Sequence, residues 1–227
     1  MRAYIGTSGW WYDWNKESSL DWYIENSGLN AIELNASFYR FPFPNQVKGW
    51  HNRGSTLTWV VKVHRLITHT YMLHGEAHHV YERFLELFKP LDESIALYLF
   101  QMPPRFKPSS LDNIEKFIKN LDSSKIAFEF RNEEWYNFDF DKLDFDGVIV
   151  TPDSPEIQDK PFYKNNCIYM RFHGRSSWYS YKYSENELKA VAKTVKIKNP
   201  KRAFAFFNND HNMLSNARTF MKLLKNQ

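Results

Sequence analysis

The chain has 227 residues, of which 43% are hydrophobic and 18% aromatic, so it has enough apolar surface for a core and is not a disordered chain. Lys and Arg (30) exceed Asp and Glu (26) by four, a basic excess that allows an anionic ligand without requiring nucleic acid or membrane. The single cysteine, Cys167, excludes an internal disulfide, and the first residues lack a signal peptide or membrane span, so we expect a cytoplasmic protein.

Short apolar runs with β-strand character recur along the chain, and helix-like segments separate most of them. In chain order the eight predicted strands are Arg2 to Gly6, Asn30 to Asn35, Leu57 to His64, Ile95 to Gln101, Lys125 to Arg131, Gly147 to Thr151, Asn166 to His173 and Arg202 to Asn208. Alternation of strands and helices predicts a parallel α/β fold.

Apolar residues at helical spacing predict the helices between these strands. The clearest segments are Gly75 to Phe88, Leu111 to Leu121, a helix that begins with a capping box of Ser184 and Glu187, and Met213 to Leu224. The region from Asn132 to Asn165 has only poor helical patterns. We therefore expect weak helices, short turns or 3₁₀ pieces after the fifth and sixth strands.

Eight strand–helix units predict a (β/α)₈ TIM barrel that forms a single domain over residues 1–227. The chain is somewhat compact for this fold, which typically needs ~250 residues. The alternative is an open doubly wound sheet. That fold often has a glycine-rich phosphate loop after the first strand, whereas Gly6-Thr-Ser-Gly9 leads into aromatic residues here.

Polar side chains gather at the C-terminal ends of nearly all predicted strands. Alternate residues of a strand share a face, so Glu33 and Asn35 lie opposite Ile32 and Leu34. Helices cover the outer face of a TIM barrel, so the polar face must point into the barrel mouth, where such folds place their active sites. The other predicted mouth residues are Lys62, His64, Gln101, Glu129, Arg131, Asp153, Arg171, His173, Asn208, Asn209 and Asp210.

The residue types at the mouth suggest acid–base chemistry on an anionic ligand. Glu33 and Glu129 are the candidate acid and base, with His64 and His173 as proton carriers. The candidate substrate-binding residues are Asn35, Lys62, Gln101, Arg131, Asp153, Arg171, Asn208, Asn209 and Asp210, with Trp10 and Tyr12 from an aromatic loop. The competing interpretation is a structural network of buried ion pairs without function.

Two aromatic loops follow the first and seventh strands. They are "GWWYDW" (Gly9 to Trp14) and "SSWYSYKY" (Ser176 to Tyr183). In a closed barrel we expect both loops to flank one entrance, where their rings would stack on a sugar or a base. Packing as a lid or as an oligomer interface is the alternative.

Motifs spread over nearly the whole chain resemble the YecE-like family, a family of unknown function. They are Ile5 to Trp10, "IELNASFYRFP" (Ile32 to Pro42), Thr68-His69, "FQMPP" (Phe100 to Pro104), "EFR" (Glu129 to Arg131) with Trp135, Asp153 to Pro155, "RFHGR" (Arg171 to Arg175), and "FNND" (Phe207 to Asp210) with Asn216-Ala217. The resemblance implies a TIM barrel, similar in fold to xylose isomerase and endonuclease IV. It implies no activity.

The chain departs from the family pattern at Asn132, where members commonly have a histidine after "EFR", and at Ala36 and Ser37 in a turn usually rich in Ser and Thr. If that histidine were the essential base of the family, this member would be impaired.

These observations favour an enzyme of hydrolase or isomerase type acting on a small anionic or sugar-like substrate, including a phosphorylated one. One alternative is nucleic-acid binding or phosphodiester hydrolysis like that of endonuclease IV; another is a non-catalytic ligand-binding barrel. No cofactor is predicted. A divalent metal held by Glu33, His64, Glu129, Asp153 and His173 is the alternative, opposed by the charges of Lys62, Arg131 and Arg171. The oligomeric state is not indicated.

Overall fold

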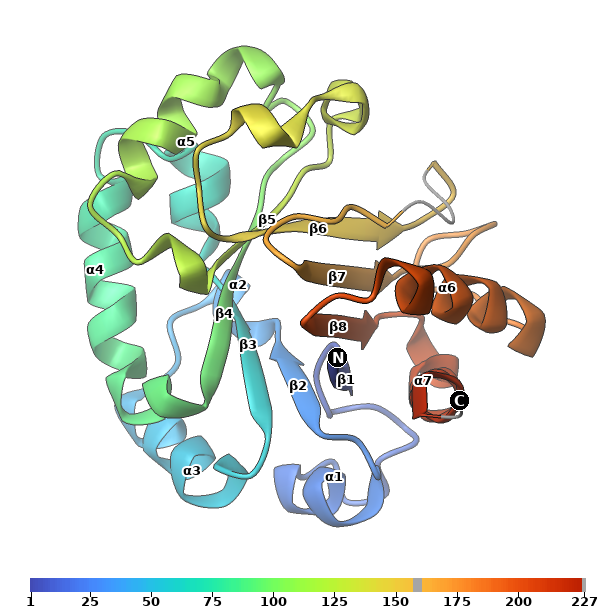
Figure 1. The fold of residues 1–227 in the computed structure, drawn as a ribbon. Helices are drawn as coiled ribbons and strands as arrows, with labels where there is room; N and C mark the ends of the chain where they lie inside the picture. The colour runs from blue at the N-terminus through green and yellow to red at the C-terminus, as the bar shows by residue number, and fades with distance from the viewer. Residues whose placement is uncertain (157–160, 226–227) are drawn as a thin grey trace.

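The computed structural model describes residues 1–156 and 161–225, and these form a closed barrel of eight parallel strands in sequence order (Figure 1). The strands are β1 (Arg2–Thr7), β2 (Ala31–Leu34), β3 (Thr58–Lys62), β4 (Ile95–Gln101), β5 (Ile126–Glu129), β6 (Val148–Asp153), β7 (Cys167–Phe172) and β8 (Arg202–Phe207). The barrel closes because β1 pairs with β8 along its whole length. The predicted TIM-barrel fold is confirmed.

The α-helices surround this barrel. They are α1 (Leu20–Asn26), α2 (Ala36–Tyr39), α3 (Pro44–Gly54), α4 (Ala77–Phe88), α5 (Leu111–Ile118), α6 (Glu185–Lys198) and α7 (Met213–Lys225). In Figure 1, α3, α4 and α5 line one side of the molecule, and α6 and α7 lie on the other. None of the helices in the described ranges is long and apolar enough to cross a membrane.

Local hydrogen bonds determine where several of these elements begin. Ser184 and Glu187 form the predicted capping box of α6, in which each side chain accepts a hydrogen bond from the other residue's backbone N–H. After β5 the side chains of Asn132 and Asp139 accept from backbone N–H groups two residues ahead. Such bonds favour short turns over long helices. Two 3₁₀ helices follow there, η5 (Glu133–Asn137) and η6 (Phe140–Lys142), as predicted.

Apolar side chains fill the half of the barrel interior that lies toward the N-terminal ends of the strands. Tyr4 stacks on Phe204 with ring centroids 4.7 Å apart. The other inward-facing members of this layer are Ala31, Val60, Leu97, Leu99, Ala127, Val148, Val150, Cys167, Tyr169 and Phe206. We call this layer the barrel floor. The same inward-facing rows continue toward the C-terminal strand ends with charged residues, so the charged groups lie directly above an apolar layer.

Candidate functional site

A buried arginine joins two buried glutamates at the centre of the barrel mouth. Arg171 Nε donates to Glu33 Oε2 (2.9 Å) and Nη2 donates to Glu33 Oε1 (2.7 Å). The third nitrogen, Nη1, donates to Glu129 Oε2 (2.6 Å). Both glutamates are fully buried and Arg171 is 1% exposed. The sequence predicted all three residues at the barrel mouth, and the structure brings them into contact.

Four neighbouring residues donate hydrogen bonds to the carboxylate of Glu33. Besides Arg171, it accepts from Ser8 Oγ (2.6 Å), from Asn35 Nδ2 (3.0 Å) and from the hydroxyl of Tyr169. Burial alone would raise the pKa of Glu33, but Arg171 and these hydrogen bonds outweigh burial and hold the pKa below its usual value. Glu33 is therefore an ionised carboxylate that positions Arg171.

Arg131 forms an ion pair with Glu129 and lies between this carboxylate and the ring of Trp178. Its Nε lies in ion-pair contact with Glu129 Oε1, and its guanidinium lies 4.5 Å from the ring centre of Trp178. Burial would raise the pKa of Glu129, but Arg131 and Arg171 lower it overall. Both glutamates thus remain charged at neutral pH, and the cluster contains one guanidinium for each carboxylate.

His173 is held as a neutral ring. Arginine can only donate, so His173 Nε2 accepts from Arg131 Nη2 (3.1 Å), and the other ring nitrogen, Nδ1, lies 3.4 Å from Asn208 Nδ2. Burial and the positive charges of Arg131, Arg171 and Lys62 lower the pKa of His173 well below its usual value. At neutral pH this imidazole orients Arg131 and does not become charged.

Lys62 is the buried amine of the cluster. Its Nζ donates to Gln101 Oε1 (2.6 Å) and lies 4.0 Å from the ring centre of Phe38. Among the described residues no carboxylate oxygen lies within 4.0 Å of Nζ. Burial, together with the charges of Arg171 and Arg131, lowers the pKa of Lys62 to about 7, although Glu129 and Glu33 oppose the shift. This amine is therefore close to half-protonated at neutral pH.

Sequence reasoning did not assign a role to His69, which lies beside Lys62. Its ring meets the ring of Phe38 edge-on at 5.0 Å, and its Nδ1 is 2.9 Å from Thr68 Oγ1. Burial and then the charges of Lys62, Arg105 and Arg131 lower the pKa of His69 to about 4. The family motif Thr68-His69 was the signal for it. Ser8 and Tyr169 were also missed, although Tyr169 shares the inward face of β7 with Arg171.

Several predicted mouth residues lie outside the charged cluster, and their expected places are corrected here. The ring of His64 packs 4.7 Å from the ring of Phe41, toward α4, and its Nδ1 accepts from the backbone of Leu66. Asn209 is buried, with Nδ2 donating to Tyr181 O and Asn216 Oδ1. Asp210 stays near the mouth, because burial and then the charges of Asp210 and Glu33 raise the pKa of Tyr12, which lines a cavity beside the charged cluster.

Asp153 also lies apart from the cluster, on the outward face of β6. It accepts two hydrogen bonds from Arg175, at 3.0 and 2.8 Å, and one from the hydroxyl of Tyr183 at 2.7 Å. Tyr183 packs edge-on against Phe172, which belongs to the outer core layer. Asp153 therefore joins β6 to the loop after β7 instead of facing a ligand at the mouth.

We expect Tyr183→Phe to lower the free energy of unfolding by about 1–3 kcal/mol, because buried polar groups lose their partner. The hydroxyl of Tyr183 donates to Asp153 and accepts from Gly174 N (2.9 Å). Urea denaturation measures the change. Tyr163→Phe is the matched control, because Tyr163 is 40% exposed and its hydroxyl donates to Asn166 at the surface; it should change the free energy by less than about 0.5 kcal/mol. Equal effects of the two variants would contradict the bridging role of Tyr183.

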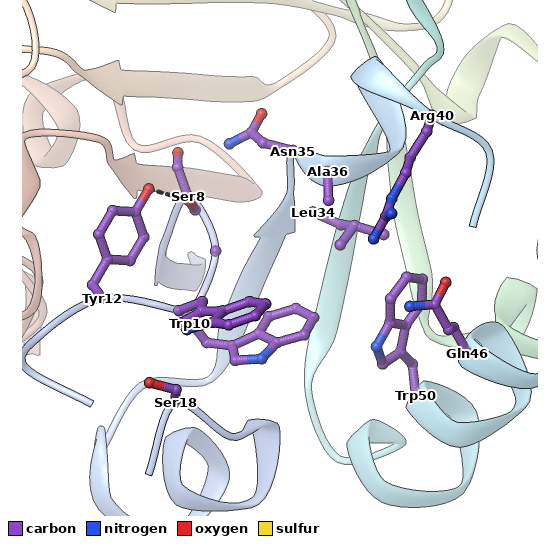
Figure 2. Close-up of a pocket in the computed structure, with 12 residues that line it drawn as sticks. Ser8, Trp10, Tyr12, Ser18, Leu34, Asn35, Ala36, Arg40, Gln46 and Trp50 are labelled. Carbon is purple, nitrogen blue, oxygen red and sulfur yellow. Dashed lines mark hydrogen bonds between the residues drawn. The ribbon is translucent and has the colours of Figure 1, made fainter. Parts of the chain in front are cut away.

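Two cavities flank the charged cluster. The first has a volume of about 410 Å³ and is shown in Figure 2, where Ser8, Tyr12 and Asn35 lie at one end and Arg40, Gln46 and Trp50 at the other. Trp10 also lines it. The second cavity, of about 520 Å³, is lined by Gln101, Pro104, Arg131, Asn132, Glu133, Tyr136, Glu156, Trp178 and Tyr179. The two aromatic loops therefore line separate cavities, which corrects the expectation of one shared entrance.

The predicted metal ligands do not fit a metal centre in this arrangement. Among the described residues no group of three or more His, Cys, Asp or Glu side chains could hold an ion. The guanidinium of Arg171 lies between Glu33 and Glu129, while His64 and Asp153 face other parts of the molecule. A cation at the mouth would also meet the charges of Arg131 and Arg171.

Comparisons with known proteins find one family and one fold. The model of DUF72, described as a protein of unknown function, matches residues 4–227. The crystal structure of a DUF72 protein from Thermotoga maritima is 25% identical, with all of both chains covered and a TM-score of 0.83. One from Enterococcus faecalis is also 25% identical, covering 100% of this chain and 98% of that one, with a TM-score of 0.79.

A more distant match shows the fold alone. D-psicose 3-epimerase from Clostridium cellulolyticum, solved with D-tagatose, is 11% identical, covers 99% of this chain and 98% of its own, and has a TM-score of 0.61. No curated protein matches the chain significantly.

Proposed function

The chain belongs to the DUF72 family, as its YecE-like motifs indicated, and we propose that it is an enzyme for acid–base chemistry on a small, anionic, sugar-like substrate. The observation that carries the proposal is the charge balance of the mouth. Two guanidiniums neutralise the two buried carboxylates, so that the protonated form of Lys62 has no carboxylate partner among the described residues. An anionic ligand would supply the missing charge.

Arg131 is the proposed anion-binding residue. It lines the second cavity beside Gln101 and Trp178, and Glu129 and His173 fix its plane from behind. A fixed guanidinium presents its remaining N–H groups as a fork that matches a carboxylate or a phosphate. The indole of Trp178 supplies an apolar face of the kind on which a sugar ring packs.

Lys62 is the proposed proton-transfer group. A general acid or base works best when its pKa is near the operating pH, and the pKa of Lys62, about 7, meets this condition. Glu33 and Glu129, the acid and base suggested by the sequence, are assigned instead to holding the two arginines. The sugar-like part of the substrate packs on the aromatic lining of the second cavity, beside Arg131. The D-psicose 3-epimerase match supports the fold only.

Arg131→Met should weaken the binding of fructose 6-phosphate by about 10- to 100-fold, because charged hydrogen bonds to the phosphate are lost. Isothermal titration calorimetry of fructose 6-phosphate and of fructose measures the effect. Arg131→Lys should lie between the wild type and Arg131→Met, since it keeps the charge and loses the planar fork.

The matched control is Arg2→Met, because Arg2 lines a cavity at the opposite end of the barrel together with Lys201 and Arg202. It should leave binding unchanged. Deuterium incorporation from D₂O beside the sugar carbonyl, followed by NMR, tests the enzymatic part. Equal affinities for fructose and fructose 6-phosphate would rule out the anion site, and binding without exchange would favour a non-catalytic barrel.

A further inference from the structure

Lys62 lies on the strand between the two strands whose ends reach the two cavities. It belongs to β3, which pairs with β2 on one side and β4 on the other. Asn35, just after β2, lines the first cavity, and Gln101, the last residue of β4, lines the second. Because Gln101 also holds Lys62 Nζ, a ligand group that takes the place of the Gln101 amide oxygen would meet the amine directly.

The surroundings of Lys62 suit a nucleophilic amine. An amine attacks carbon only when it is unprotonated, and desolvation beside other cations favours this form. Lys62 is 7% exposed and lies near Arg131 and Arg171. In a solvated lysine with a pKa of about 10.4, roughly one amine in 2,500 is unprotonated at pH 7. Lys62, with its pKa of about 7, is close to half unprotonated.

We propose that Lys62 forms a Schiff base with the carbonyl carbon of an aldehyde or ketone whose anionic group is held by Arg131. This inference rests on the proposed function for the anionic end of the substrate and adds the carbonyl as its reacting group. Lys62 then acts first as a nucleophile, and the resulting iminium draws electrons away from the neighbouring carbon.

The chemistry needs no further reagent. The lone pair of Nζ adds to the carbonyl carbon, and a proton moves from nitrogen to the former carbonyl oxygen to give a carbinolamine. The carbinolamine hydroxyl then takes a proton from solvent and leaves as water, and the nitrogen lone pair forms the carbon–nitrogen double bond of the protonated iminium. Gln101, whose amide oxygen accepts from Nζ, orients the amine toward the second cavity before the reaction.

The test is reductive trapping of the wild-type protein at pH 7 with dihydroxyacetone phosphate and sodium cyanoborohydride, followed by peptide mapping. Hydride reduces the iminium to a stable secondary amine, which adds the mass of the carbonyl compound less one oxygen atom. Lys62 should be labelled at least about tenfold faster than the exposed lysines, because far more of its amine is unprotonated. Its labelling should rise with pH near 7, whereas that of exposed lysines continues to rise toward pH 10.

Lys62→Met should abolish the fast labelling, and Lys201→Met, at the opposite end of the barrel, should preserve it. Dihydroxyacetone without phosphate is the parallel probe. Fast labelling of Lys62 by both probes, independent of Arg131, would support the Schiff base and contradict the anion site. Labelling spread evenly over the lysines, while fructose 6-phosphate still binds through Arg131, would overturn the Schiff base and leave the proposed function standing.

Discussion

Arg171→Met is expected to lower the free energy of unfolding by about 3–5 kcal/mol at neutral pH. The guanidinium makes three hydrogen bonds to Glu33 and Glu129, and both carboxylates are fully buried. Methionine is long and carries no charge, so among the described residues Glu33 would have no arginine partner and Glu129 would keep Arg131. Removing one partner of a buried ion pair is far more costly than removing both.

The loss should depend on pH. In the wild type the folded pKa values of Glu33 and Glu129 lie below the unfolded value, so their stabilisation is present above about pH 4.3 and is lost as the pH falls through the folded values. Without Arg171, burial raises these pKa values. The two carboxyl groups of the variant then become protonated as the pH falls, which removes the cost of burying their charges. The difference between the two proteins should therefore shrink from pH 7 to pH 4.5.

Urea denaturation at both pH values measures the two differences. Arg53→Met, which breaks an exposed pair with Asp21, is the matched control and should cost less than about 1 kcal/mol at either pH. If Arg171→Met and Arg53→Met gave equal losses, the central role of the buried cluster would be wrong.

Lys62→Met should have the opposite effect on stability and raise the free energy of unfolding by about 2–4 kcal/mol at pH 7. The folded pKa of Lys62, about 7, is lower than the unfolded value, about 10.4. Between these values the unfolded state binds more protons than the folded state, so wild-type stability increases as the pH rises from 7 to 10.4. Methionine removes this penalty, which is greatest below pH 7.

The gain from Lys62→Met should therefore decrease steadily from pH 6 to pH 10, as measured by urea denaturation along the pH series. Lys107→Met is the control, because Lys107 pairs with Glu134 at the surface and its removal should have little effect at any pH. A destabilised Lys62→Met protein at all pH values would show that the amine is a structural ion. Stabilisation with loss of trapping would indicate that the site retains Lys62 for chemistry at the expense of stability.

The strands could be predicted from the sequence because each has the composition of a buried parallel strand between turn residues. All eight predicted runs overlap an observed strand, and Ile95–Gln101 matches to the residue. Alternation also placed Glu33, Lys62, Glu129 and Arg171 correctly, since each continues a row of inward-facing residues. The region after β5 was read correctly for the same kind of reason: its Asn and Asp residues favour local turns.

The errors arose where the alternation rule does not hold or was not followed. His64 lies beyond the end of β3, where the chain has already turned. The alternation of side chains along a strand therefore cannot predict the direction of its ring. Asp153 lies inside β6, and strict alternation with the inward-facing Val148 and Val150 would have placed it outward. His69 comes from the π-helix η1 (Leu66–Thr70), and no strand pattern predicts its approach to Phe38.

The barrel floor has a kinetic consequence. The stacked rings of Tyr4 and Phe204 and their apolar neighbours fill the interior beneath the charged cluster, so the barrel is a cup and not a pore. A molecule that reaches Lys62 from the C-terminal mouth therefore cannot pass through to the opposite end of the barrel and must leave at the mouth again. In the proposed enzyme, substrate entry and product release would both take place at this end.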